Sequence, residues 1–267
     1  MAVFTENVII LTGASEGIGR ALALALAPQK PKLVIAARQA ERLESLAAEC
    51  RALGAEALPV TTDVTDEAQC RRLAEKAVEA YGQVDTLVVN AGATMWTRLD
   101  QLQDPGVLEK VMAVNYFGAA YCTMAALPYL KASKGRIVAI ASVAGLTGVP
   151  ERTGYSASKH AMVGFFDSLR IELEDTGVTV TVIAPDFVVS QIHRRALGAD
   201  GRPLGETPMQ EARIMTAERC AELIVTAMEK RQRLLITSLR GKLGRWFKLI
   251  APGLIDRIAR KAIEQRR

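Results

Sequence analysis

The sequence predicts an α/β fold in which a doubly wound, parallel sheet of seven strands carries helices on both faces. Seven short runs rich in β-branched residues are apolar on both sides, as expected for strands of a sheet that is covered by helices on both faces. These runs alternate with segments of three- and four-residue apolar spacing, which is typical of amphipathic helices. No repeat, low-complexity segment or linker divides the 267 residues, so we expect a single domain.

The expected strands follow one another at intervals that leave room for a helix between them. They lie at residues 7–13, 32–38, 56–64, 85–92, 135–142, 178–186 and 233–238. The clearest helical spacing occurs in GIGRALALALA and in ERLESLAAECRALG. Residues 187–208 contain Gly and Pro without periodicity, and a loop of this length is often a lid or a binding loop.

Composition argues against several classes of protein. The four cysteines show no C-x-x-C spacing, which argues against zinc or a disulfide framework and for a reducing compartment: Cys50, Cys70, Cys122 and Cys220. With only His160 and His193 present, we expect no metal site. We read His160, next to Lys159, as structural. No basic segment precedes the first apolar run, and no run reaches the ~18 residues of a membrane span, so we expect a cytoplasmic protein.

A glycine-rich turn joins the first expected strand to the first helix. Gly13, Gly17 and Gly19 are spaced G-x-x-x-G-x-G in LTGASEGIG. Such a turn lets the backbone approach a pyrophosphate, and the free N–H groups of the following helix bind it. The strand–turn–helix context favours a dinucleotide site over an ordinary loop.

The end of the second strand carries Arg38 where NAD-binding proteins usually have an acid. A guanidinium can bind the 2′-phosphate of NADP through two hydrogen bonds. We therefore predict that NADP(H) is preferred over NAD(H), the alternative being that Arg38 is a solvated residue at a strand end. Asp63 and the Asn90–Gly92 segment end the next two strands, at the edge where ligands of parallel sheets bind.

These features resemble the short-chain dehydrogenase/reductase family. The resemblance covers about residues 5–240 and rests on motifs that match in order and spacing: TGASEGIG from Thr12, Asp63-Val64, Asn90-Ala91-Gly92, Asn115, Ser142 and YSASK from Tyr155. It implies one Rossmann-type domain and NAD(P)-dependent interconversion of carbonyl and alcohol. It also implies cofactor contacts from Ser15, Glu16, Ile18, Val64, Ala91, Pro185, Val188 and Ser190, besides the residues above.

Tyr155 and Lys159 are four residues apart, so on a helix both point into one cleft. The lysine charge favours tyrosinate, which allows Tyr155 to act as the general acid in reduction and the base in oxidation. The resemblance assigns Lys159 also to the nicotinamide ribose and to a proton relay through a water held by Asn115, and Ser142 to the substrate oxygen. Taken alone, the pair would more often be amphipathic residues on a helix flank.

The sequence departs from the family pattern in two places. Asp186 replaces the usual glycine in PDFVVS, where it either tunes substrate choice or caps the turn. Residues 241–267 extend the expected catalytic domain, residues 1–240, with a basic segment that Pro252-Gly253 divides into two amphipathic helices. The extension fits an anionic membrane surface, a dimer arm or a flap over the substrate cleft. Apolar residues between its bases argue against nucleic-acid binding.

The leading hypothesis is an NADP-dependent reductase of a lipophilic or bulky ketone or aldehyde, similar to hydroxysteroid dehydrogenases. The alternatives are a 3-oxoacyl thioester reductase, against which the extension argues, and a regulatory or scaffold protein that binds NADP without turnover. The resemblance further implies a homodimer or homotetramer formed through helices at about 105–131 and 152–175.

Overall fold

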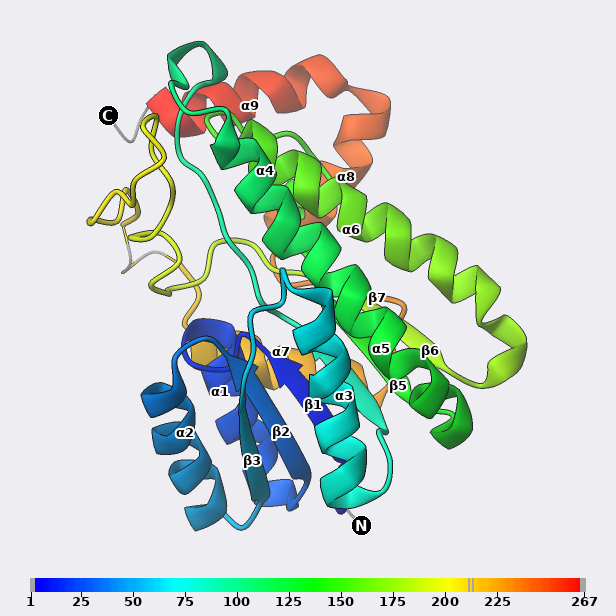
Figure 1. Ribbon diagram of the computed structural model, residues 1–267. Coiled ribbons are helices and arrows are strands. Elements are labelled where there is room, and N and C mark those ends of the chain that lie inside the picture. The colour runs from blue at the N-terminus through cyan, green and yellow to red at the C-terminus, as the bar shows by residue number, and fades with distance from the viewer. Residues whose placement is uncertain (1–2, 211, 213, 265–267) are drawn as a thin grey trace.

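The computed structural model describes residues 3–210, 212 and 214–264, and it contains the seven-stranded sheet that the sequence predicts (Figure 1). All strand pairs are parallel, and the order is β3-β2-β1-β4-β5-β6-β7. The strands are β1 Val8–Thr12, β2 Lys32–Ala37, β3 Glu56–Thr61, β4 Thr86–Val89, β5 Arg136–Ile140, β6 Thr179–Ala184 and β7 Leu234–Ile236. The chain reverses direction across the sheet beside β1, which opens a ligand crevice at the carboxyl ends of β1 and β4.

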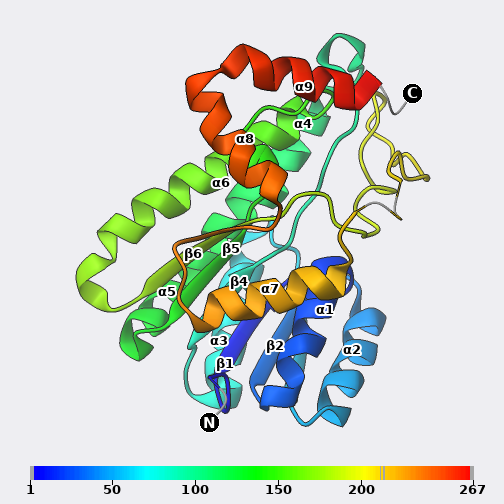
Figure 2. The same cartoon turned by 180° about the vertical axis from the view of Figure 1, so that it is seen from behind.

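Helices cover both faces of the sheet, as Figures 1 and 2 show from opposite sides. One face carries α1 Gly17–Leu26, α2 Ala40–Ala52 and α7 Ala217–Glu229, and the other carries α3 Glu67–Tyr81, α4 Gly106–Met112, α5 Gly118–Ser133 and α6 Thr153–Glu172. Short 3-10 turns lie at Ala27–Gln29, Leu99–Gln101, Val143–Gly145 and Glu174–Thr176. The central strands β1, β4 and β6 are buried almost throughout, which explains their apolar residues on both sides, whereas the edge strands β3 and β7 are partly exposed.

The helix expected at about 105–131 is interrupted. A π-helical turn, Ala113–Phe117, separates α4 from α5. Its buried residue, Asn115, bonds to groups on two other segments, and π turns are commonly found where a functional residue must be placed off the regular helical path. Hydrophobic periodicity cannot reveal one inserted residue, so the sequence predicted an uninterrupted helix.

Two helices follow the last strand, α8 Leu239–Ile250 and α9 Pro252–Glu264. They are separated where Pro252-Gly253 predicted a break, and residues 265–267 of the extension lie outside the described residues. The Ser238 hydroxyl caps α8 by accepting from the Gly241 amide at 2.9 Å. Both helices lie at the end of the molecule where the strands have their carboxyl ends (Figures 1 and 2). Across the described residues, no helix is long and apolar enough to cross a membrane.

Candidate active site

A cavity of about 790 Å³ lies at the carboxyl edge of the sheet and continues under α8 and α9. Most predicted site residues line it: Gly13, Ser15, Glu16, Gly17, Ile18, Arg38, Asp63, Val64, Asn90, Ala91, Gly92, Ser142, Tyr155, Lys159, Pro185, Val188 and Ser190. Gly19 and Asn115 are the two that do not line it, and both lie directly behind the wall. The structure therefore brings the predicted nucleotide and catalytic residues together in one space.

The glycine-rich turn fits a bound pyrophosphate. Gly13 and Gly17 have φ angles of +64° and +54°, which favour glycine. A Cβ on Gly19 would lie 2.3 Å from the Gly13 carbonyl oxygen, so no larger residue fits there. The α1 N-terminus has no side-chain cap, which leaves its first N–H groups available to an anion at the positive end of the helix dipole.

Two polar side chains hold this turn against the neighbouring strand. Asn90 Nδ2 donates to the carbonyl oxygens of Thr12 and Gly13, both at 3.0 Å. Thr12 Oγ1 accepts from the amides of Asn90 and Ala91 at 3.0 and 3.1 Å. Asn90 thus shapes the nucleotide cradle from behind, with its side-chain amide already used by the protein.

Charged residues surround the adenosine end of the cavity. Glu16 accepts from Arg42 at 2.9 Å and from Arg195, so its carboxylate is neutralised by two guanidinium groups. Arg195 comes from the 187–208 loop, which therefore reaches the turn. Arg38 lines the same end and is exposed, and no carboxylate of the described residues pairs with it. Its guanidinium remains available to an anionic ligand.

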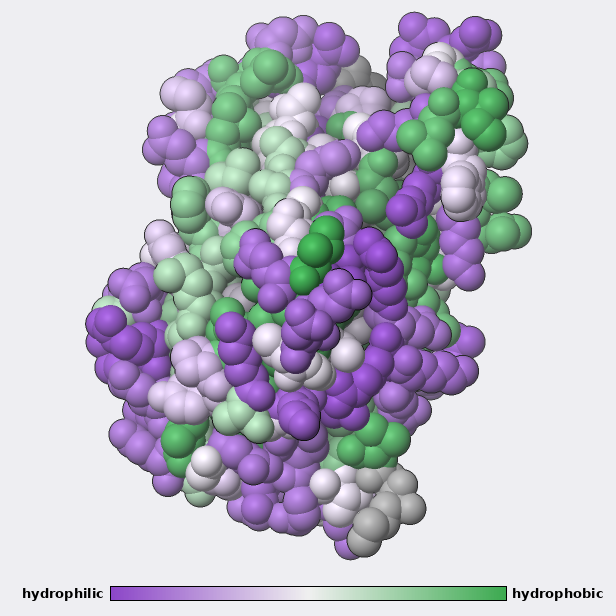
Figure 3. Space-filling view, turned by 90° about the vertical axis from the view of Figure 1, so that its right-hand side faces the viewer, coloured by the Kyte–Doolittle hydropathy of each residue, from purple (hydrophilic) through white to green (hydrophobic). Residues whose placement is uncertain are grey.

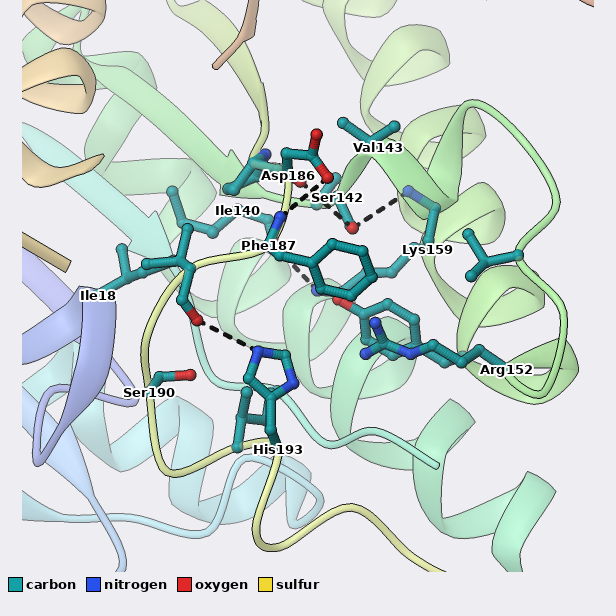
Figure 4. A pocket seen from close by; sticks show the side chains of 18 of the residues that line it. Ile18, Ile140, Ser142, Val143, Arg152, Lys159, Asp186, Phe187, Ser190 and His193 are labelled. Carbon is teal, nitrogen blue, oxygen red and sulfur yellow. Dashed lines mark hydrogen bonds between the residues drawn. The ribbon is translucent and has the colours of Figure 1, made fainter. Parts of the chain in front are cut away.

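Ser142, Tyr155 and Lys159 line the opposite end of the cavity. Figure 4 shows Ser142 and Lys159 near each other there. Ser142 follows β5, and its Oγ accepts from the Ala144 amide at 3.1 Å. Tyr155 and Lys159 are on one face of α6, with the Lys159 ammonium 5.9 Å from the Tyr155 ring centroid. Both residues are largely buried, with 7% of Tyr155 and 3% of Lys159 exposed.

The Lys159 ammonium is anchored inside the protein, where Nζ donates to the Ile140 carbonyl at 2.9 Å and contacts Met162 Sδ at 3.3 Å. Burial, and after it the nearby charge of Arg152, lowers the pKa of Lys159 from 10.5 to about 7. The site therefore contains a lysine that can gain or lose a proton near neutral pH.

Asn115 lies behind the catalytic end of the cavity, in the π turn. Its Oδ1 accepts from the Ala93 amide at 2.8 Å, and its Nδ2 donates to the Ala93 carbonyl and to Ser158 Oγ at 2.9 and 2.8 Å. These three bonds use both amide hydrogens and one lone pair of the Oδ1 atom. A water of the relay that the resemblance implied would therefore bond to the Asn115 backbone or to the remaining lone pair of Oδ1.

Asp186, the residue in place of glycine, caps its own turn and fixes α8. Its Oδ1 accepts from the Phe187 amide at 2.9 Å, and its carboxylate pairs with Arg240 at 2.8 Å and accepts from Ser238 at 2.7 Å. Burial favours the neutral acid, but the bonds from Arg240 and Ser238 outweigh it and lower the pKa of Asp186 below its usual value. The sequence left open whether Asp186 tunes substrate choice or caps the turn, and these contacts are those of a capping residue.

Sequence reasoning missed several cavity residues. Arg152 and Phe187 lie beside Tyr155, and the lining also includes residues of α8 and α9: Leu239, Leu243, Phe247, Ile255, Ile258 and Ala259. Arg152 precedes Tyr155 by three residues and is the residue directly before α6, a nearness in sequence that could have identified it. For the extension the sequence offered a flap over the substrate cleft as one of three alternatives, and residues of α8 and α9 do line the cavity.

Comparisons with known proteins agree with this geometry. The family model for short chain dehydrogenase matches residues 7–199. A Dictyostelium discoideum protein named dehydrogenase/reductase SDR family protein 7-like is 33% identical over 97% of this chain and 82% of its own. An Arabidopsis thaliana protein named 11-beta-hydroxysteroid dehydrogenase 1A is 33% identical over 95% of this chain and 76% of its own.

Solved structures resemble the whole fold. A short chain dehydrogenase/reductase from Burkholderia phymatum in complex with NAD has a TM-score of 0.83 and 29% identity over 95% of this chain and 96% of its own. An alcohol dehydrogenase from Thermococcus sibiricus complexed with 5-hydroxy-NADP has a TM-score of 0.74 and 27% identity, covering 87% and 95% of the two chains. The chain described here belongs to the short-chain dehydrogenase/reductase family.

Proposed function

We propose that this protein is an NADP(H)-dependent oxidoreductase that interconverts a carbonyl and a secondary alcohol on a lipophilic or bulky substrate, like a hydroxysteroid dehydrogenase. The observation that carries the proposal is the single cavity in which the glycine-rich turn, Ser142, Tyr155 and Lys159 meet an apolar wall from α8 and α9. The names of relatives such as the Arabidopsis hydroxysteroid dehydrogenase support the substrate class.

Each residue of the site has its own part in the proposed reaction. When bound, a nicotinamide cofactor supplies the hydride in reduction and accepts it in oxidation. Tyr155 donates a proton to the carbonyl oxygen in reduction and accepts it from the alcohol in oxidation. The Ser142 hydroxyl orients the substrate oxygen. Lys159 adds positive charge beside Tyr155 and holds the nicotinamide ribose, and Pro185, Val188 and Ser190 contact the nicotinamide half of the cofactor.

The proposed preference for NADP(H) rests on Arg38. The two structural neighbours do not decide between the cofactors, because one is a complex with NAD and the other is a complex with an NADP derivative. Fluorescence titrations with NADPH and NADH test it. We expect tighter binding of NADPH and a loss of that preference in Arg38→Ala, with Arg51→Ala, an arginine at the far end of α2, as the matched control. Equal affinity in wild type for both nucleotides would contradict the role of Arg38.

The substrate class is tested by following NADPH consumption with a panel of steroid and other lipophilic ketones, a 3-oxoacyl thioester and small polar ketones. We expect turnover with the lipophilic ketones and a loss of about 10²–10⁴-fold in Tyr155→Phe, which removes only the acid–base hydroxyl. Preference for the thioester favours the alternative reductase. Nucleotide binding without turnover of any carbonyl favours a scaffold or regulatory role.

The C-terminal extension, residues 241–267, is proposed to form a flap over the substrate cavity whose outer side contacts an anionic membrane surface. Leu243 and Phe247 face the cavity, whereas Trp246, Leu249 and Ile250 are largely exposed. Figure 3 shows apolar side chains gathered at this end of the molecule. Exposed apolar groups with interspersed Lys and Arg fit an interfacial helix.

Sedimentation with vesicles that contain phosphatidylserine tests the membrane contact. We expect binding that is weakened by salt and by Trp246→Ser, whereas vesicles of phosphatidylcholine alone should bind poorly. A dimer that buries these residues, seen as loss of the dimer in the same variant, would favour the dimer-arm alternative.

We also propose a homodimer or homotetramer formed through the outer faces of α4–α5 and α6. Large apolar side chains are exposed there, with Phe117, Met124 and Ile171 at 44%, 63% and 69%. Light scattering of wild type and Met124→Glu tests it: a smaller particle in the variant supports this interface, and a monomeric wild type contradicts it.

A further inference from the structure

One buried cation in the cavity wall is used neither by the nucleotide turn nor by the Ser142, Tyr155 and Lys159 chemistry. Arg152 precedes α6 directly and is only 4% exposed. Burying a charged group costs free energy unless the surroundings compensate it. A guanidinium buried this deep, three residues before Tyr155, therefore needs contacts that compensate the free-energy cost of its burial.

Aromatic rings surround the guanidinium. Arg152 Cζ lies 4.2 Å from the centroid of the Tyr155 ring, and 5.1 and 5.7 Å from those of Trp96 and Phe187. Its Nη2 donates to Thr94 Oγ1 at 2.6 Å, which fixes it to the segment after β4. Figure 4 shows Arg152 and Phe187 side by side in the cavity. A cation on a desolvated ring face is attracted to the ring and would interact still more strongly with a phenolate.

The two cations beside Tyr155 differ in how their charge depends on pH. Lys159 is 5.9 Å from the ring centroid, and its depressed pKa of about 7 means that it is charged for only part of the time at neutral pH. Arg152 is closer to the ring, and a guanidinium stays protonated across the whole working range. The constant charge next to the phenol is therefore that of Arg152.

We propose that Arg152 is a positioning residue for Tyr155, which holds the ring by stacking and supplies the pH-independent positive charge that favours the ionised phenol. This inference rests on the proposed role of Tyr155 as acid and base. In oxidation the phenolate accepts the hydroxyl proton of the alcohol, and a guanidinium on the ring stabilises the negative charge of that base. In reduction the same contact keeps the ring in place for donation of the proton.

The other charged groups near the ring come from four segments. Glu151, next to Arg152, accepts from Trp96 Nε1 at 2.9 Å, and Asp186 is paired with Arg240 of α8. His193, in the loop after β6, has its ring 6.1 Å from that of Phe187 and is the only one of these groups that ordinarily titrates near neutral pH. A His193→Gln variant therefore serves as the control for titration by a neighbour.

The test is the ultraviolet absorbance of tyrosinate, followed from neutral to alkaline pH in wild type, Arg152→Met and Arg152→Lys. Each protein is paired with its Tyr155→Phe version, and the difference isolates Tyr155 from the other four tyrosines. We expect the Tyr155 signal to appear about one pH unit higher in Arg152→Met, an effect typical of losing an opposite charge at this distance. Arg152→Lys should keep most of the wild-type midpoint, and His193→Gln should keep all of it.

Coincident titrations of wild type and Arg152→Met would overturn the inference, as would a shift of the same size in Arg152→Lys. Should Arg152→Met fail to fold by circular dichroism, Arg152→Gln replaces it, since its amide keeps a polar bond to Thr94 without the charge. The titration uses neither nucleotide nor ketone, so its result is independent of whether the protein reduces the substrates in the panel. Active wild-type enzyme with coincident titrations would overturn the role of Arg152 alone.

Discussion

The two ends of the cavity are built in different ways. The end beside the glycine-rich turn, at β1 and β4, is built mainly from glycine and backbone, with Asn90 and Thr12 holding the turn through hydrogen bonds between two neighbouring strands and with charged side chains at its rim. The substrate end, at β5 and β6, consists of buried charged side chains such as Arg152 and Lys159 and of helices that return from the end of the chain. The first end depends on shape, and the second depends on charge and on long-range packing.

The largest effect on nucleotide binding should come from filling the nucleotide end. In Gly19→Ala the added Cβ would lie 2.3 Å from the Gly13 carbonyl oxygen and 2.5 Å from Asn90 Nδ2, so the turn must move. We expect a fall in stability of about 1–3 kcal/mol and a loss of NADPH affinity of about 100-fold. Chemical denaturation and calorimetric titration measure the two.

The matched control is Gly253→Ala in α9, where a Cβ would meet nothing within 4 Å. It should change neither quantity measurably. Wild-type NADPH affinity in Gly19→Ala would show that the turn does not need glycine, and the contrast between a shape-dependent end and a charge-dependent end would then fail.

The substrate end should respond to pH instead. Lys159 has its pKa lowered from 10.5 to about 7 by burial, so the protonated form costs free energy in the folded state. Below pH 7 the lysine is protonated both folded and unfolded, and the full cost applies. Between pH 7 and 10.5 the unfolded chain binds more protons, so wild-type stability from this group rises with pH, and above 10.5 the cost is gone.

Lys159→Met should therefore be more stable than wild type by about 2–4 kcal/mol below pH 7, although it removes a group from the proposed catalytic site. The difference should shrink steadily toward pH 10.5. Denaturation curves at several pH values measure it, with the exposed Lys131→Met as the control. A difference that is constant with pH would show that the charge of Lys159 carries no such cost.

A smaller effect is expected where the extension meets the catalytic residues. Asp186→Asn weakens the pair with Arg240, whose side chain is 63% exposed, so we expect a loss of only about 1 kcal/mol. Hydrogen exchange should increase in α8, and KM for lipophilic ketones should rise more than kcat falls. Asp200→Asn, in an exposed pair at 3.8 Å, is the control. Unchanged exchange in α8 would show that other contacts hold the helix.

The difference between the two ends also explains what the sequence could and could not predict. The parallel seven-stranded sheet, the glycine-rich turn and the placing of Asn90, Tyr155 and Lys159 at one cavity could be predicted from motifs and from the rule that parallel strands end at one edge. The π turn around Asn115 was not predictable, because one inserted residue leaves the apolar pattern of a helix nearly unchanged. The contacts of Asp186 with Ser238 and Arg240 join residues more than 50 positions apart, which no local pattern encodes.

Arg152 combines a feature that the sequence could predict with one that it could not. It directly precedes the helix that carries Tyr155, three residues before it, so its nearness in the sequence could be seen without the structure. Its burial and its aromatic surroundings depend on Trp96 and Phe187, which come from the segments after β4 and β6. Residues that only tertiary packing brings together were the ones that the sequence did not identify.

The most direct test of the account is a crystal structure of the protein soaked or co-crystallised with NADP⁺. We expect the pyrophosphate at the Gly13–Gly19 turn, the 2′-phosphate on Arg38 and the nicotinamide at the end that holds Tyr155. Arg152 should still be stacked on the Tyr155 ring. A nucleotide bound with its nicotinamide away from Tyr155, or with its 2′-phosphate away from Arg38, would contradict it.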